Sequence, residues 1–282
     1  MSALNLVATP GGLARVIGDD AEILDLPYRD VAELLAAGEG LDPARTARPA
    51  RRVPAASLDG ALLPPLGRTR AIWGVGLNYH SKAKLTGRAI PTEPILFLRA
   101  PSAVSAPGAE VALPLDRSVK PDYEGEVAFV VGRPMSRVPE DRVWDHIAAV
   151  TAANDMTARD VMAATNTPTL AKSFPGFGAM GASVLELGAV PDRDAIPVRT
   201  RVNGVVHQDS STAELIFSVP DLISRISFFA DLEPGDVVLT GTPAGTGQDR
   251  RVFLRPGDEV EVTVPGVLPL RTRFRPGPES PS

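Results

Sequence analysis

Apolar residues in this chain gather in short runs that polar or turn-forming residues close. Such runs of four to eleven residues, bounded by turn signals, are typical of buried strands. Four of them follow one another in the middle of the chain: residues 71–79, 94–104, 126–132 and 146–155. Two alternating segments flank Asn203-Gly204, and this dipeptide is the strongest short-range signal for a β-hairpin. The pattern therefore predicts a β-rich fold of the α+β class.

The first 66 residues differ in pattern from the rest of the chain. Residues 4–9 and 13–18 flank a proline-glycine turn and predict an opening hairpin. Residues 28–40 predict a helix, which Asp30 can cap and glycines can end. Residues 41–60 are rich in proline, alanine and arginine, show no clear period and are interpreted as a linker. We therefore divide the chain into a small N-terminal α+β module with its linker, residues 1–66, and a main domain, residues 67–282.

Three segments complete the predicted main domain. Residues 219–232 have the pattern of a helix, and residues 235–247 that of a strand entering a glycine-rich loop. Residues 253–274 predict a terminal β-meander, and the tail 276–282 is expected to be disordered. No internal repeat is visible in the sequence.

Composition narrows the classes of partner. With 29 Lys and Arg against 34 Asp and Glu the net charge is −5, so nothing favours nucleic acid or an anionic membrane. The chain has no cysteine, which excludes disulfides and thiolate metal sites. It contains no run of about 18 apolar residues, and its N-terminus lacks the features of a signal peptide. We expect a cytoplasmic protein with a small-molecule partner.

Two glutamates stand at the entrance to the apolar run 126–132. Glu124 and Glu126 are two residues apart, so in a strand their side chains point the same way, about 7 Å apart. Carboxylates that share a buried face repel each other and are costly to desolvate. One of them can be protonated, both can remain in water, or a cation can neutralise them. The spacing alone leaves these alternatives open.

Asp155 adds a third carboxylate at the end of a neighbouring apolar run. It can face the glutamates, or it can cap a turn or a helix that begins near Met156. A site made of carboxylate oxygens alone suits Mg²⁺ or Mn²⁺, completed by water or substrate oxygens. This pattern makes a divalent-metal site one reading of the three acids.

Seven short motifs then occur in one order over residues 71–275. They read GLNY, PSAV, DYEGEVAFVVG, ANDMTARD, AKSF, NGVVHQ and GDVVLTGTPAGTG. This series resembles the fumarylacetoacetate hydrolase family. The resemblance implies a mixed β-roll, a homodimer, and a divalent metal, Mg²⁺ or Mn²⁺, bound by Glu124, Glu126 and Asp155.

The resemblance also points to residues around a bound carboxylate substrate. Lys172 matches the lysine of the active site, where an ammonium can hold a carboxylate or stabilise an enolate oxygen; a surface lysine is the alternative. The predicted substrate-binding residues are Arg99, Arg159, Gln208, Gly241 and Thr242. Arg159 can equally form a salt bridge on a helix surface, and Gln208 can lie on the surface of the hairpin.

One departure from the family bears on the reaction. Hydrolytic relatives read GLNYxxHxxE, in which the histidine and glutamate of a lid activate water. Here Lys82 and Leu85 occupy those two positions, and His80 lies two positions early, about 200° round a helix. Lys82 and His80 remain candidate catalytic residues beside Lys172. An exposed and functionally neutral lid is the alternative for both.

Three functions are compatible with these residues. The resemblance implies a metal-dependent enzyme that hydrolyses a carbon–carbon bond in a 2-oxo or 1,3-dicarbonyl carboxylate. The missing pair favours a non-hydrolytic use of the same platform: isomerisation, decarboxylation, cyclisation or dehydration. A positioned general base contributes about a hundred- to ten-thousand-fold, so its loss is costly to hydrolysis. A non-catalytic metabolite binder is the third possibility.

Overall fold

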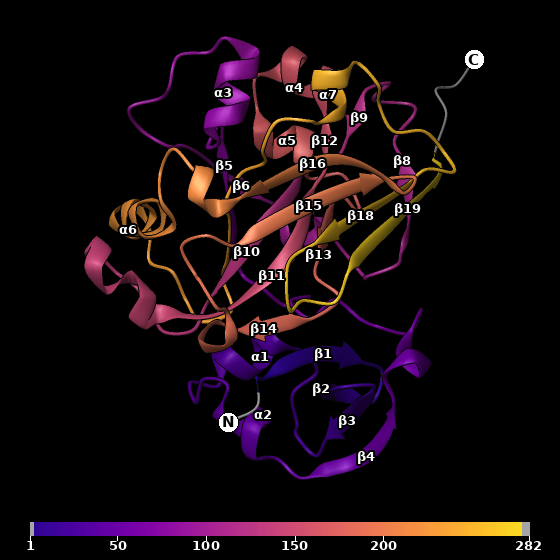
Figure 1. Cartoon of the computed structure of the whole chain (residues 1–282), viewed down its shortest axis with the longest axis vertical. Coiled ribbons are helices and arrows are strands. Elements are labelled where there is room, and N and C mark those ends of the chain that lie inside the picture. Colours follow the sequence, from indigo (N-terminus) through magenta and orange to yellow (C-terminus); the bar gives the residue numbers. More distant parts are fainter. Residues whose placement is uncertain (1–2, 278–282) are drawn as a thin grey trace.

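A computed structural model describes residues 3–277 of the chain, and Figure 1 shows two modules stacked end to end. The N-terminal module, at the bottom of Figure 1, is an antiparallel sheet with two short helices. Its strands are β1 (Asn5–Thr9), β2 (Gly12–Ile17), β3 (Asp20–Leu24) and β4 (Pro49–Pro54). Its helices are α1 (Val31–Ala36), α2 (Asp42–Thr46) and the 3₁₀ turn η1 (Ala55–Leu58). β1 and β2 form the predicted hairpin.

The predicted helix and the predicted linker had different outcomes. α1 begins after Asp30, whose side chain accepts a hydrogen bond from the amide of Glu33 at 2.8 Å, as the N-cap prediction requires. The linker prediction for residues 41–60 was wrong, because this segment contains α2, β4 and η1. β4 pairs only with β3, and its side chains are largely exposed, which explains why the sequence shows no apolar period. An edge strand of this kind also tolerates proline.

One large sheet runs through both modules. It has 12 strands, and β1 pairs with β14 (Val184–Glu186) to join the N-terminal strands to the main domain. The path then continues through β11 (Ile147–Asp155), β10 (Gly125–Val131), β17 (Val237–Leu239), β5 (Ile72–Gly76) and β6 (Ile95–Arg99). Off this path, β13 (Gly178–Met180) pairs with β11, and β7 (Val104–Ser105) pairs with β13. The proposed boundary at residue 67 stays a prediction.

A second sheet of five strands packs against the first. It contains the predicted hairpin, whose turn residues Asn203 and Gly204 both have positive φ, and the predicted terminal meander. Its order is β16 (Val205–Ser211), β15 (Pro197–Val202), β18 (Glu259–Thr263), β19 (Leu270–Pro276) and β8 (Glu110–Leu113). A small third sheet pairs β9 (Pro121–Asp122) with β12 (Thr157–Ala158). The prediction of a disordered tail over 276–282 was wrong at Pro276, which ends β19, and residues 278–282 lie outside the described residues.

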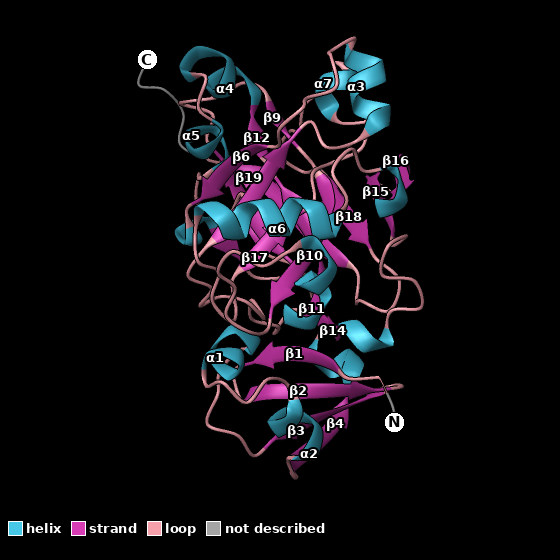
Figure 2. Cartoon of the chain, turned by 90° about the vertical axis from the view of Figure 1, so that its left-hand side faces the viewer, coloured by secondary structure: helices cyan, strands magenta, loops and turns pink. Residues whose placement is uncertain are grey.

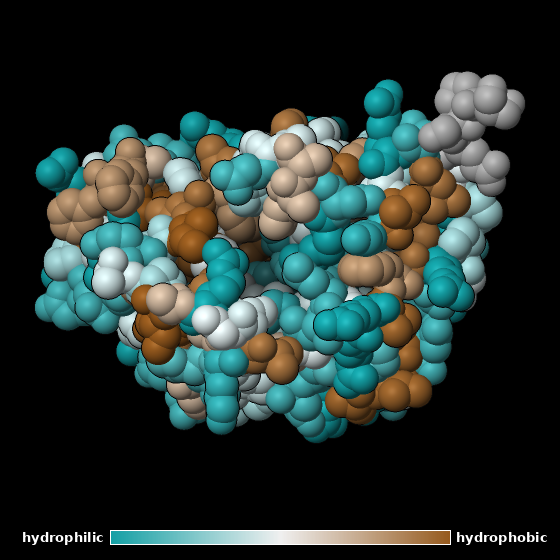
Figure 3. All heavy atoms as spheres, turned by 90° about the horizontal axis from the view of Figure 1, so that it is seen from above, coloured by the Kyte–Doolittle hydropathy of each residue, from teal (hydrophilic) through white to brown (hydrophobic). Residues whose placement is uncertain are grey.

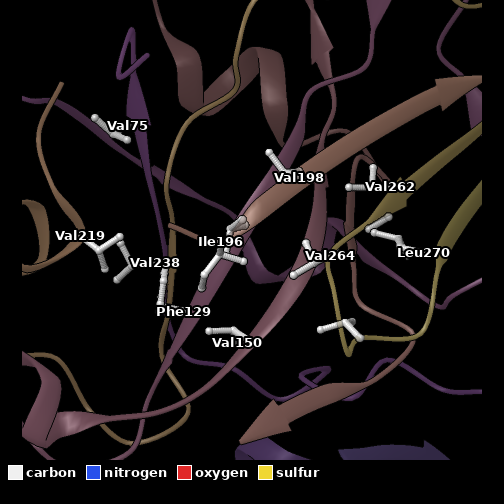
Figure 4. Close-up of a cluster of buried hydrophobic side chains, with 14 of the residues drawn as sticks. Val75, Phe129, Val150, Ile196, Val198, Val219, Val238, Val262, Val264 and Leu270 are labelled. Carbon is white, nitrogen blue, oxygen red and sulfur yellow. The ribbon is translucent and has the colours of Figure 1, made fainter. Parts of the chain in front are cut away.

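The central strand β10 is buried on both faces, which explains its uninterrupted apolar sequence. Val127, Phe129 and Val131 face the core between the two sheets, and Figure 4 shows Phe129 there among valines from β11, β15 and β18. Ala128 and Val130 face a second core, which is shared with the N-terminal module. Successive side chains of a strand point to opposite faces, so one strand serves both cores.

Short helices gather at the end of the main domain that lies opposite the N-terminal module. They are α3 (His80–Thr86), α4 (Arg159–Thr165), α5 (Pro168–Lys172) and α7 (Gly247–Arg250). Figures 1 and 2 place all four together at the top of the molecule. The predicted helix 219–232 is α6 (Val219–Phe229), which lies along one side of the main domain in Figure 2. The remaining turns are η2 (Pro101–Ala103), η3 (Glu140–His146), η4 (Leu187–Ala189) and η5 (Thr212–Glu214).

Candidate active site

The three acids singled out by the sequence meet at this helical end of the main domain. β10 and β11 pair antiparallel, so Glu124, just before β10, lies beside Asp155 at the end of β11; the amide of Asp155 donates to the carbonyl of Glu124 at 2.8 Å. One carboxylate oxygen from each of Glu124, Glu126 and Asp155 lies within 4.8 Å of the others. All three residues are at most 6% exposed, which excludes the alternative of a solvated strand end.

Within the trio Glu124, Glu126 and Asp155, the pKa values of Glu124 and Glu126 are shifted in opposite directions. Burial raises the pKa of Glu126 well above its ordinary value, and the negative charges of Asp155 and Glu124 raise it further. Burial also raises the pKa of Glu124, but Arg159 and Lys172 outweigh this and lower it to about 2. Three convergent carboxylates, one of them destabilised by its neighbours, are a donor set that a hard divalent cation fits.

Lys172, at the end of α5, brings its ammonium directly to the trio. It donates to Glu124 at 2.6 Å, to the Asp155 carboxylate, and to the Thr157 hydroxyl at 2.8 Å. The ring of Phe97 lies 5.2 Å from the ammonium nitrogen. The residue is 4% exposed, so the alternative of a surface lysine is excluded. A positive charge held here can stabilise an anionic oxygen in the site.

Arg159 links the trio to a fourth buried acid. Its Nε donates to Asp122 at 2.7 Å and its terminal nitrogen to Glu124 at 2.5 Å. Asp122 also accepts hydrogen bonds from the amides of Gly247 at 2.6 Å and Gln248 at 2.9 Å, at the start of α7. The guanidinium is therefore buried among acids, and the alternative of an exposed salt bridge on α4 is excluded. Its predicted contact with substrate stays a prediction.

Arg99 lies behind Asp155. One terminal nitrogen donates to the Asp155 carboxylate and, at 3.1 Å, to the carbonyl of Met156; the other donates to the carbonyl of Lys172. The side chain is 1% exposed. In this arrangement Arg99 orients Asp155 and the end of α5, and its predicted role in substrate binding stays a prediction.

Gln208 and the glycine-rich loop hold the start of β10. The Gln208 carbonyl oxygen accepts from the amide of Gly125 at 3.0 Å, and its amide nitrogen donates to the Thr242 hydroxyl at 2.7 Å. Thr242 donates in turn to the carbonyl of Gly125 at 3.0 Å, and Gly241 donates its amide to Glu126 at 2.8 Å. Gln208 is 1% exposed, so a place on the hairpin surface is excluded. Substrate contacts of these three residues stay predictions.

The three lid residues have two different environments. His80 and Leu85 are exposed on α3. Lys82 is buried, and its ammonium donates to both oxygens of Asp249, at 2.8 and 2.7 Å, and to the Thr246 hydroxyl at 2.8 Å. The exposure that the alternative of a neutral lid requires is present at His80 and absent at Lys82. A catalytic role for either residue stays a prediction.

Sequence reasoning missed two acids of this region. Asp122 stands two residues before Glu124 in the DYEGE motif, where alternation already places both on one face. Asp249 stands three residues after Thr246, and the pair forms a capping box at the start of α7. The spacing Thr-x-x-Asp was the available signal for this helix start. Neither spacing reveals that a cation from a distant helix pairs with the acid.

Seen from above in Figure 3, the helical end of the main domain is hollowed near its centre, and hydrophobic and hydrophilic side chains both reach the rim of the hollow. Among the residues that the structure describes, no helix is long and apolar enough to span a membrane.

The chain is similar in sequence and in structure to several known proteins. This chain is 32% identical to the mitochondrial oxaloacetate tautomerase fahd2 of Xenopus laevis over 257 residues, which is 87% of this chain and 80% of that protein. Fumarylacetoacetate hydrolase from Exiguobacterium antarcticum superposes with a TM-score of 0.84 at 26% identity, covering 97% of this chain and 99% of that one. The 2-hydroxyhepta-2,4-diene-1,7-dioate isomerase of Mycobacterium marinum superposes with a TM-score of 0.78 at 28% identity, covering 98% of both chains.

These neighbours include a hydrolase, a tautomerase and an isomerase on one fold. The sequence also matches the family described as fumarylacetoacetate (FAA) hydrolase C-terminal over residues 71–275, the span of the seven motifs. The predicted β-rich α+β fold and the resemblance are thereby confirmed. The chain belongs to the fumarylacetoacetate hydrolase family of enzymes.

Proposed function

We propose that this enzyme interconverts the keto and enol forms of a 2-oxo carboxylate, with oxaloacetate as the first compound to test. The observation that carries the proposal is the ammonium of Lys172, which lies against the carboxylate trio in a buried site. The relative named oxaloacetate tautomerase supports the choice of compound.

The side chains divide the work of such a reaction in a simple way. A divalent cation bound by Glu124, Glu126 and Asp155 would polarise the 2-oxo group as a Lewis acid. Lys172, whose ammonium contacts Glu124, Asp155 and Thr157, would turn an N–H to the oxygen that becomes negative as the α-proton leaves to a water molecule, once those carboxylates bind the cation. The ammonium can then donate a proton to that oxygen to give the enol, and the water molecule returns a proton to the amine. Burial strengthens this electrostatic stabilisation because few water molecules compete for the donors.

Hydrolysis, the family-typical reaction, is the second candidate. Within the described residues, no hydrogen bond joins a histidine to the trio, and the lid helix α3 presents exposed His80 and Leu85. Lys82, which occupies the position of the lid histidine, donates its hydrogen bonds to Asp249 and Thr246. No hydrogen bond joins a described side chain of α3 to the trio, and this arrangement favours the tautomerase over the hydrolase.

The test follows both reactions with one enzyme preparation, with MgCl₂ or MnCl₂ present. Oxaloacetate enolisation is measured by ultraviolet absorbance and by deuterium exchange at C3, and acylpyruvates are assayed for pyruvate release. We expect fast enolisation, intact acylpyruvates, and a loss of about a hundredfold or more in Lys172→Met. Lys84→Met, an exposed lysine of α3, is the matched control.

Two outcomes would change the assignment. Cleavage of acylpyruvates at a rate matching or exceeding enolisation would make the enzyme a hydrolase. Binding without any exchange would make it a metabolite binder.

We also propose, on the resemblance alone, that the chain forms a homodimer, which analytical ultracentrifugation tests. The cytoplasmic location stays a prediction.

A further inference from the structure

Lys82 is an unusual lysine, because its charged end is buried on a short helix. Its side chain is 10% exposed, and its ammonium, which has three donors, contacts the Thr246 hydroxyl and both Asp249 oxygens between 2.7 and 2.8 Å. Burial of an ammonium is costly unless acceptors surround it. The engagement of all three donors leaves Lys82 suited to holding a position and poorly suited to accepting a proton.

Asp249, which accepts the hydrogen bonds of Lys82, is itself held by backbone amides outside α3. Asp249 accepts the backbone amides of Gly245 at 2.8 Å and Thr246 at 3.0 Å, within the capping box of α7. Burial raises the pKa of Asp249, but the hydrogen bond and charge of Lys82 outweigh it, so the pKa is lowered. Asp249 is therefore a fixed, ionised anchor at which Lys82 docks.

The rest of α3 has few attachments to the protein. Only Lys82 and Ala83 of this helix are buried, and residues 84–90 are all exposed. Besides Lys82, the polar contact from α3 to the glycine-rich loop is a hydrogen bond of 3.4 Å between the Ala244 amide and the Ser81 hydroxyl. A single buried ion pair therefore carries much of the attachment between α3 and α7.

The same ion pair is connected to the trio through buried charges. On its other side, α7 donates the amides of Gly247 and Gln248 to Asp122 at 2.6 and 2.9 Å. Asp122 binds Arg159, and Arg159 donates to Glu124 at 2.5 Å. A continuous series of hydrogen bonds and ion pairs thus runs from Lys82 on α3 to Glu124 of the trio.

We propose that the Lys82–Asp249 pair is a latch that fixes α3 against α7 and closes the helical end over the site. Lys82 is then a positioning residue, and the proton of the reaction is handled elsewhere. Opening of the latch frees α3 and the exposed segment 84–90, and it loosens the path through Asp122 and Arg159 to Glu124.

The direct test is hydrogen–deuterium exchange of the intact chain, which needs no substrate and does not depend on the proposed function. In Lys82→Met we expect the amides of α3 to exchange about tenfold faster or more, because a buried charge-assisted contact is lost. Amides of the loop 241–247 should stay protected, since Asp249 still holds Gly245 and Thr246. Lys84→Met should exchange like the wild type, and Lys82→Arg should restore most of the protection.

Kinetics then separate positioning from chemistry. If oxaloacetate is turned over, Lys82→Met should raise KM more than it lowers kcat, and Asp249→Asn added to it should cost little more, because the two residues act as one pair. Unchanged α3 exchange in a folded Lys82→Met would refute the latch. A loss of kcat with normal exchange would make Lys82 catalytic. Absence of oxaloacetate turnover would overturn the proposed function and leave the exchange result to decide the latch.

Discussion

Replacement of Glu126 by glutamine should have opposite effects on stability with and without a divalent cation. The amide has nearly the shape of the carboxyl group, and its carbonyl oxygen can still accept the Gly241 amide that now donates to Glu126 at 2.8 Å. The substitution therefore removes one buried titratable group and little else. In the wild type an ionised Glu126 would face the negative charges of Glu124 and Asp155.

The size of the effect follows from the distances in the trio. Two unit charges at most 4.8 Å apart repel by at least about 3.5 kcal/mol at an effective dielectric constant near 20. Together with burial, this repulsion raises the pKa of Glu126 above its ordinary value. A raised folded-state pKa means that the folded chain holds a proton that the unfolded chain releases as the pH rises above its own carboxyl pKa. Stability then falls by about 1.4 kcal/mol per pH unit until the folded-state pKa is passed.

Glutamine at position 126 removes this slope. Without a divalent cation, the variant should gain on the wild type by up to about 2.8 kcal/mol between pH 5 and pH 7. Each kcal/mol corresponds to roughly 2–4 °C in Tm for a chain of this size. With MnCl₂ the order should reverse, because a ligand that binds the folded state stabilises it and the variant offers one carboxylate fewer.

The assay is thermal unfolding followed by circular dichroism at pH 5, 6, 7 and 8, in EDTA and in MnCl₂. Glu110→Gln, an exposed glutamate at the start of β8, is the matched control and should follow the wild type in every buffer. The reasoning fails if Glu126→Gln is the less stable protein in EDTA at pH 7, or if the gap stays constant with pH. An equal rise in Tm with MnCl₂ for both proteins would remove the trio as the metal site.

Two further predictions concern the framework around the site. In Gly125→Ala a new Cβ would lie 1.8 Å from the Thr200 hydroxyl oxygen, so the free energy of unfolding, measured in urea, should fall by about 2–3 kcal/mol. The control is Gly188→Ala, whose Cβ would meet nothing within 4 Å and whose stability should stay close to that of the wild type. Equal losses in the two variants would contradict the clash. Asp30→Ala should cost about 1 kcal/mol by removing the cap on Glu33, whereas Asp30→Asn should retain it; equal costs would contradict a capping role.

Much of the fold is visible in the sequence because its strands are short, apolar and bounded by turns. The turn at Asn203 and Gly204 and the cap at Asp30 are local signals, and both predictions were confirmed. The linker prediction for residues 41–60 failed because an exposed edge strand needs no apolar period. Such a strand owes its existence to hydrogen bonds with β3, which the sequence does not display.

The sequence also predicted one part of the candidate site and not another. The trio lies together, as the alternation of a strand and the likeness to a family predicted. The burial of Lys82 and its pairing with Asp249 could not be predicted, because a lysine on a short polar helix has the sequence signature of an exposed residue. Contacts between residues 167 positions apart depend on how α3 and α7 pack. Composition and local spacing carry no information about that packing.

The strand pairing between β1 and β14 has a consequence for any shortened form of this protein. Asn5 and Leu6 lie opposite Leu185 and Val184 in the antiparallel pairing, and both modules contribute side chains to one core. A chain that begins at residue 67 would leave the edge of β14 bare and an apolar face uncovered. Edges of this kind recruit strands from other molecules. Deletion of the first module should therefore yield aggregates instead of a smaller working enzyme, and heat should melt the intact chain in one cooperative step.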